Sequence, residues 1–218
     1  MTSVSSALPT LNHSHVASIQ EHIARVVEDL LASFPPVEGL STDERRGIIA
    51  RYTAVLEGNF IYWMTGAYLS VRSEEARSKI LENLREEVRD CHPGMMRRFA
   101  MAADAVPRES DALAVYRNLS NVRLFIGRLS PIPILVTMAF FECFIQQFMA
   151  YLAECARRQG STEQEYTDVH GVCDIAHTEE LFHALEAEMA LAGEPVDNLF
   201  EGVQLLGTLI QNMGEAHP

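Results

Sequence analysis

The chain has 218 residues, 48% of them hydrophobic, and its 17 basic and 30 acidic residues give a formal net charge of −13. This length and hydrophobicity suit one large domain with a substantial core. The negative charge would repel a nucleic acid duplex or an anionic membrane surface, so neither is an expected partner. Its four cysteines show no C-x-x-C spacing, which suits a reducing cytoplasm better than a disulfide framework.

The N-terminal residues 1–15 lack the basic start and apolar run of a signal peptide. We expect them to form a mobile tail, followed by one helical domain over residues 16–218. The longest apolar stretch covers residues 131–141 and ends at Glu142, well short of a membrane span. A cytoplasmic protein without a membrane anchor is therefore expected.

Apolar residues recur at helical spacing along the rest of the chain, and no segment shows sustained alternation of period two. The pattern predicts an all-α fold of about seven or eight helices. Caps, prolines and glycines set the expected helices at residues 16–34, 43–69, 73–91, 93–105, 111–127, 131–158, 161–193 and 196–214.

Two glutamates are hard to place on a solvent-facing stripe. Glu57 and Glu142 both sit in segments that are apolar on most sides of a helix. A buried carboxylate costs several kcal/mol unless it is paired or binds a cation. We therefore expect a positive group near each of them, either an arginine or a metal ion.

The stretch HGVCDIAH, residues 170–177, places polar side chains on one face of a helix. With His170 at 0°, Asp174 falls at about 40° and His177 at about 340°. The next positions on this stripe are apolar, so the stripe continues toward the core. Two imidazoles and a carboxylate are a ligand set that suits iron, manganese or zinc. A chance arrangement on an amphipathic helix is the alternative.

The same helix carries a competing motif, E-x-x-H, at Glu180 and His183. Ferritin-like proteins with two metal ions use this spacing, but here both residues turn away from the His170 stripe. Their neighbours Glu179, Glu186 and Glu188 indicate a solvated acidic face.

A third set of candidate donors lies in NLREEVRDCHP, residues 83–93. Glu86 and Glu87 precede His92, and Pro93 is expected to end the helix at this point. Glu87 and His92 would converge only if the helix loosens between them. An exposed acidic face followed by a helix-ending histidine is the alternative.

Taken together, these donors resemble the heme-oxygenase-like diiron oxidases and oxygenases, which share the fold of heme oxygenase, thiaminase II and the pyrroloquinoline-quinone cyclase. The resemblance covers residues 43–190 and rests on N-L-x-x-E, a following histidine, a glutamate and H-x-x-x-D-x-x-H. It selects Glu87, four residues after Asn83, over Glu86. The implied ligands of two Fe(II) ions are Glu57, Glu87, His92, Glu142, His170, Asp174 and His177.

The resemblance implies that O2 is a co-substrate and that a small carboxylate-bearing molecule is oxidised in a biosynthetic pathway. An amino acid or a derivative is the expected substrate, with N-oxygenation or oxidative C–C cleavage as the reaction. Arg123 and Arg128 precede the helix of Glu142 and are candidates to bind the substrate carboxylate. Ordinary surface arginines are the alternative.

Three other functions are compatible with the fold class. A metal-independent, thiaminase-like hydrolase would need a nucleophile such as Cys143 or Cys173, and heme binding would need His22. A non-catalytic helical binding protein would hold no iron. An exposed apolar helix face would suit a homodimer in any of these cases.

Overall fold

The computed structural model describes residues 8–192 and 196–215, and within them the chain forms nine α-helices and one short 3-10 helix, η1. No strand occurs in these ranges, which confirms the predicted all-α class. The elements are α1 Leu8–Ser33, η1 Val37–Gly39, α2 Thr42–Leu56, α3 Asn59–Ser70, α4 Glu74–Arg89, α5 His92–Ala102, α6 Glu109–Ile126, α7 Pro131–Arg158, α8 Glu165–Ala192 and α9 Glu201–Gly214.

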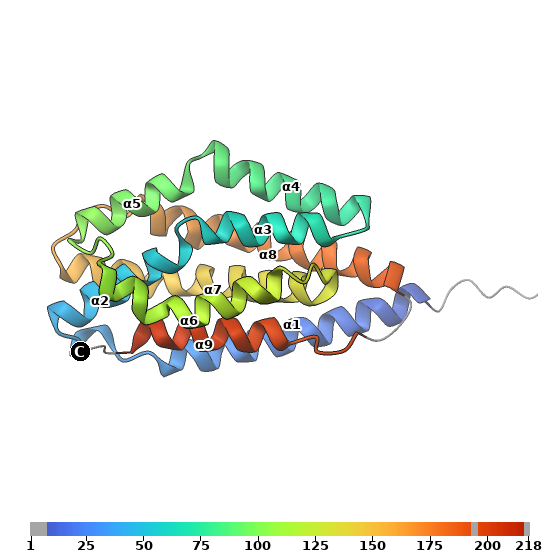
Figure 1. The fold of residues 1–218 in the computed structure, drawn as a ribbon, viewed down its shortest axis with the longest axis horizontal. Helices are drawn as coiled ribbons and strands as arrows, with labels where there is room; N and C mark the ends of the chain where they lie inside the picture. Colours follow the sequence, from blue (N-terminus) through green and yellow to red (C-terminus); the bar gives the residue numbers. More distant parts are fainter. Residues whose placement is uncertain (1–7, 193–195, 216–218) are drawn as a thin grey trace, which may run out of the picture.

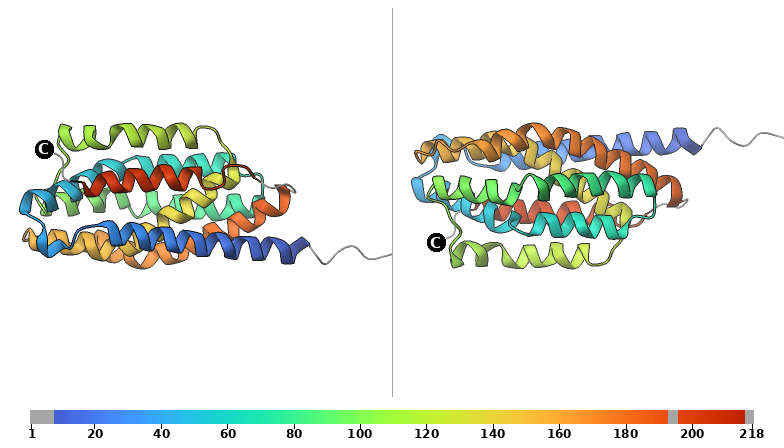
Figure 2. Two further views of the ribbon diagram at one scale, coloured as in Figure 1. Left: turned by 90° about the horizontal axis from the view of Figure 1, so that it is seen from below. Right: turned by 90° about the horizontal axis from the view of Figure 1, so that it is seen from above.

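Helix α7 forms the centre of the bundle and packs against α8, α9, α1, α2 and α3 (Figure 1). It is the one described helix that is long and apolar enough to cross a membrane, but 83% of its apolar window is buried inside the bundle. The core helix of a bundle gives the same signal as a membrane span. Figure 2 shows α6 at the outer edge, away from α8.

The segment expected as one helix over residues 43–69 is divided in two. Helix α2 ends at Leu56 and α3 begins at Asn59, because Gly58 adopts a left-handed backbone with φ of 75°. Glycine adopts this conformation without the steric cost that other residues meet. This break adds one helix to the expected number and frees Glu57 from a helical face.

The N-terminal helix starts earlier than expected. Helix α1 begins at Leu8, inside the segment that was expected to be a mobile tail over residues 1–15. Residues 1–7 of that segment lie outside the described residues. From Val16 onward α1 buries its apolar side chains in the core, as the spacing predicted.

Glu188 joins α8 to the start of α4. It was expected on a solvated acidic face, but its side chain is only 2% exposed. Its Oε2 accepts hydrogen bonds from the backbone N–H groups of Arg72 and Ser73, both at 2.9 Å. Ser73 is the N-cap of α4, so this carboxylate holds the helix that carries Glu87 against α8.

We expect Glu188→Ala to lower the free energy of unfolding by about 1–3 kcal/mol, because it leaves two buried backbone N–H groups without an acceptor. Urea denaturation would measure this effect. The exposed Glu179 on the same helix is the matched control, and Glu179→Ala should change stability by less than about 0.5 kcal/mol. Equal stability of the two variants would contradict the capping role of Glu188.

Candidate metal centre

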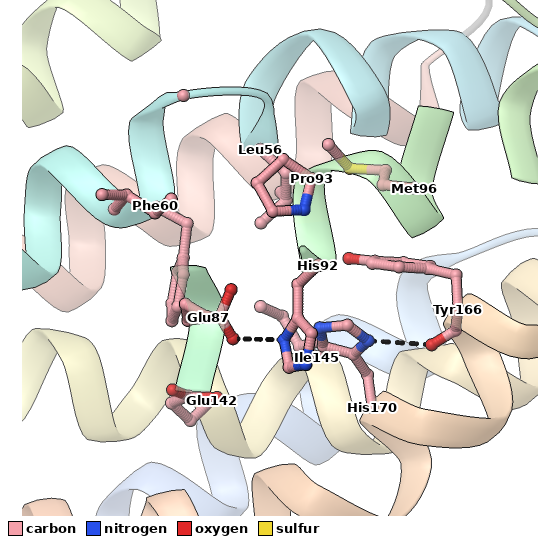
Figure 3. A pocket seen from close by; sticks show the side chains of 12 residues that line it. Leu56, Phe60, Glu87, His92, Pro93, Met96, Glu142, Ile145, Tyr166 and His170 are labelled. Carbon is pink, nitrogen blue, oxygen red and sulfur yellow. Dashed lines mark hydrogen bonds and ion pairs between the residues drawn. The ribbon is translucent and has the colours of Figure 1, made fainter. Parts of the chain in front are cut away.

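Three donors from three helices meet near the junction of α4 and α5. Glu87 lies near the end of α4, His92 begins α5, and His170 lies in α8. All three are buried, and their ligand atoms lie within 4.8 Å of one another. Figure 3 shows the Glu87 carboxylate directed at the His92 ring. The distance from Glu87 Oε1 to His92 Nδ1 is 2.7 Å. We call these residues the first donor group.

A sharp turn brings Glu87 and His92 together. On an uninterrupted helix, side chains five residues apart would point about 140° away from each other. Here α4 ends at Arg89, and Cys91 adopts a left-handed backbone with φ of 57°. Pro93 then occupies the first turn of α5, where its missing N–H is tolerated. The helix boundary predicted from Pro93 is therefore confirmed.

Hydrogen bonds and burial orient the histidines of the first donor group. His170 Nδ1 donates to the backbone carbonyl of Tyr166 at 2.8 Å, which leaves Nε2 with its lone pair (Figure 3). Burial lowers the pKa of His170 to about 4, so this ring is neutral near pH 7. For His92 burial opposes protonation, but the hydrogen bond and charge of Glu87 raise its pKa above the ordinary value. A neutral imidazole with a fixed ring is the form that binds metals, and His170 already has this form. His92 would release its proton on binding a metal ion.

A second set of donors lies farther along α8. The ligand atoms of Cys173, Asp174 and His177 also lie within 4.8 Å of one another, and we call these residues the second donor group. His177 Nε2 lies 3.1 Å from a carboxylate oxygen of Glu86. Its other nitrogen, Nδ1, lies 3.7 Å from Asp174 Oδ1 and 3.8 Å from Glu142 Oε1.

Glu142 on α7 lies between the two groups. Its side chain is 1% exposed, and its Oε1 accepts a hydrogen bond from Asn83 Nδ2 at 3.2 Å. It lines the same cavity as the first donor group and approaches His177 of the second. Burial raises the pKa of Glu142 to about 7, because the charged form loses its hydration.

Several buried atoms of the donor groups lack a partner in the protein and would be satisfied by a bound cation. Asp174 Oδ2, His177 Nδ1 and Asn83 Oδ1 are buried and have no hydrogen-bond partner. Among the described residues, no lysine or arginine forms an ion pair with Glu87, Glu142 or Asp174. Burial also raises the pKa of Asp174 well above its ordinary value. Divalent metal ions would satisfy these atoms and compensate the carboxylate charge.

A small cavity adjoins the first donor group. Its volume is about 20 Å³, enough for about one water molecule. Most of its wall is apolar, and the break between α2 and α3 contributes to it. The lining residues are Leu56, Gly58, Phe60, Ile61, Glu87, His92, Pro93, Met96, Glu142, Ile145, Tyr166 and His170.

Glu57 does not join the other predicted ligands. It lies at the break after α2, its side chain is 37% exposed, and it forms an ion pair with Arg97 on α5 at 2.5 Å. The expectation of a buried carboxylate was wrong because the chain leaves the helix at Gly58. The positive group expected near Glu57 is present, but it is Arg97 at a partly exposed position.

Arg123 and Arg128 also lie away from the donors. They line an exposed hollow beside Tyr62 and do not line the cavity. Arg123 Nε donates to Asn59 Oδ1 at 2.8 Å, and Arg128 forms an ion pair with Glu201 at 2.7 Å. The prediction that they bind a substrate carboxylate at the metal centre is not supported, because Arg123 on α6 and Arg128 in the turn after α6 are both exposed at the surface.

The residues that a thiaminase-like hydrolase or a heme-binding protein would need do not lie in suitable surroundings. Burial raises the pKa of the Cys143 and Cys173 thiols, which disfavours the thiolate that a nucleophilic mechanism needs. The ring of His22 packs on Phe200, with centroids 4.2 Å apart, and does not line the cavity.

The E-x-x-H motif lies outside both donor groups, as the helical wheel indicated. Glu180 forms an ion pair with Lys79 at 3.3 Å, and His183 is exposed. Three contributors were not recognised from the sequence: Cys173 in the second donor group, Glu86 as the partner of His177, and Tyr166 in the cavity wall. Cys173 stands one helical turn before His177, which was the available signal.

A family model described as iron-containing redox enzyme matches residues 49–206. The chain belongs to this family. The match confirms the predicted relationship to heme-oxygenase-like proteins, and the matched region contains both donor groups and Glu142. No curated protein and no solved structure matched the chain. The family's enzymes contain iron, and the buried histidine and carboxylate side chains of the two donor groups are suitable ligands for iron.

Proposed function

We propose that the protein is a non-heme diiron oxidase or oxygenase that uses O2 to oxidise a small carboxylate-bearing substrate. The observation that carries this proposal is the pair of donor groups with Glu142 between them. Three histidines and three carboxylates suit two ferrous ions better than one. Bound there, two ferrous ions would supply electrons to O2.

The protein's own residues would hold and orient the donors. Glu87, His92 and His170 would hold one ion, and Asp174 and His177 the other, with the Glu142 carboxylate lying between the two groups. The Tyr166 carbonyl fixes the His170 ring, and the Glu86 carboxylate fixes the His177 ring. We therefore assign Glu86 a positioning role and keep Glu87 as the ligand.

The cavity suggests how a substrate would approach. The apolar wall of the cavity would exclude water from the donors. Because the cavity holds only about one water molecule, it would have to widen to admit a substrate. Arg97 follows the lining residue Met96, and its partner Glu57 stands between the lining residues Leu56 and Gly58. We propose Arg97, in place of Arg123 and Arg128, as the group that meets a substrate carboxylate. An amino acid or an amino-acid derivative remains the predicted substrate class.

Anaerobic titration with ferrous iron tests the proposal. We expect close to two iron ions per chain, and oxidation of the bound iron with consumption of O2 after admission of air. Asp174→Ala and His92→Ala should each lower the iron content by about half or more. The double variant Glu180→Ala/His183→Ala is the matched control, because it removes the E-x-x-H motif and should bind iron like the wild type.

Binding of less than one iron ion per chain, with no change in the Asp174→Ala and His92→Ala variants, would contradict the proposal. That result would favour a non-catalytic helical binding protein, which needs none of these donors. Loss of iron from the Glu180→Ala/His183→Ala variant would show that iron binds at the E-x-x-H motif, and this result would also contradict the proposal.

A further inference from the structure

We propose that Cys173 is a ligand of the metal ion in the second donor group, so that this position carries a sulfur donor and the first does not. This inference rests on the proposed function, because it concerns the same pair of metal positions. It adds a thiolate to a donor set that otherwise contains only nitrogen and oxygen.

The positions of the three side chains support a shared ion. Cys173 Sγ donates a hydrogen bond to Asp174 Oδ1 at 3.1 Å, and all three ligand atoms of the group lie within 4.8 Å. Bonds of about 2.3 Å to sulfur and about 2.1 Å to oxygen would place two ligand atoms of one metal ion roughly 3.1–3.6 Å apart, depending on the angle between the bonds. The sulfur and oxygen therefore already stand at the separation of neighbouring ligands.

The polar atoms beside Cys173 point to the same ion independently. Asp174 Oδ2 and His177 Nδ1 have no hydrogen-bond partner, and their side chains are 1% and 4% exposed. A thiol that serves only as a hydrogen-bond donor to Asp174 Oδ1 would leave both of these atoms unsatisfied. An ion among the three residues would satisfy all of them.

The other cysteines lack such surroundings. Cys91 is exposed, and Cys143 Sγ accepts a hydrogen bond from Gln147 at 3.5 Å. Cys155 is buried in the hydrophobic core. None of these three belongs to a donor group among the described residues. Cys143 is therefore a suitable control for an effect specific to Cys173.

The binding step is a ligand exchange without a change in oxidation state. The Cys173 S–H bond breaks, its proton leaves to solvent, and the sulfur electron pair forms the bond to the metal. A coordinating thiol is deprotonated even where its surroundings disfavour a free thiolate. The sulfur makes the second position softer than the first, so we expect the two positions to differ in metal preference.

Cobalt(II) provides a direct test in the full-length metal-free protein. We expect visible bands from bound cobalt, together with a near-ultraviolet band from sulfur-to-cobalt charge transfer. Cys173→Ser should remove the near-ultraviolet band and keep cobalt bound at the first donor group. Cys143→Ser should keep both signals.

Persistence of the near-ultraviolet band in Cys173→Ser, or its absence from wild-type protein with two bound cobalt ions, would overturn the inference and leave the proposed function standing. Failure of cobalt and iron to bind at all would instead overturn the proposed function. X-ray absorption of the zinc-loaded wild type avoids any dependence on a variant. A sulfur shell at about 2.3 Å is expected, and a shell of nitrogen and oxygen alone would refute the role of Cys173.

Discussion

Glu142→Gln is expected to stabilise the metal-free protein while it removes most of its metal binding. Glu142 is 1% exposed and has no lysine or arginine partner among the described residues. Burial raises its pKa from an ordinary value of 4.5 to about 7, so at pH 8 the folded protein holds an unfavourable charge. A neutral amide avoids this cost and keeps the hydrogen bond from Asn83. We expect a gain of about 1–2 kcal/mol at pH 8.

The pH dependence follows from the direction of this shift. Because the folded state holds the Glu142 proton more tightly than the unfolded state, ionisation of Glu142 lowers stability as pH rises from about 4.5 to about 7. The advantage of Glu142→Gln should therefore be full above pH 7 and vanish near pH 4.5. Urea denaturation of the metal-free variant and wild type at several pH values measures it.

Glu142→Gln should weaken metal binding, although it stabilises the metal-free protein. Loss of a carboxylate placed between both donor groups should weaken iron binding by roughly 100-fold or more. Glu154→Gln is the control on the same helix, because Glu154 pairs with Arg157 and Arg158 near the surface. It should change stability by less than about 1 kcal/mol and leave iron binding unaltered. A metal-free Glu142→Gln variant that is less stable than wild type at pH 8 would contradict the interpretation of Glu142.

Gly202→Ala is expected to lower the free energy of unfolding by about 2–3 kcal/mol. A Cβ atom at this position in α9 would overlap Thr137 Oγ1 and the Phe125 ring. Thr137 belongs to α7 and Phe125 to α6, and all of them are buried. Overpacking of this kind costs about 1–3 kcal/mol, and here rigid groups stand on two sides. Thermal or urea denaturation measures the loss.

Gly207 on the same helix provides the matched control. A Cβ at Gly207 would meet only Leu30 Cδ1 at 3.9 Å, an ordinary contact. Gly207→Ala should therefore be neutral or stabilise the protein by about 0.5–1 kcal/mol, because alanine favours the helix. An equally small effect of Gly202→Ala would contradict the close packing of α9 against α7 and α6 at this position.

The sequence predicted the parts of the site that depend on helical periodicity. His170, Asp174 and His177 share one stripe of α8, and all three are buried. The same wheel turned Glu180 and His183 away from that stripe. The Pro93 boundary also allowed Glu87 and His92 to converge. In each case the geometry of one helix, or of one helix end, decided the outcome.

Features that depend on local irregularity or on contacts between helices could not be predicted in this way. Periodicity gave no sign that Gly58 would adopt a positive φ, so Glu57 was expected in the core. The outward placement of Arg123 depends on how α6 packs. The hydrogen bond between Glu86 and His177 depends on how α4 packs against α8. These relations arise only when the bundle is assembled.

The most direct test of the central claim is a crystal structure of the iron-loaded protein with anomalous scattering measured at the iron edge. We predict two anomalous peaks per chain. One should lie within bonding distance of Glu87, His92 and His170, and the other of Asp174 and His177, with Glu142 between them. A well-ordered, iron-loaded crystal with no peak at these residues, or with its peaks on the exposed acidic surface, would contradict the account.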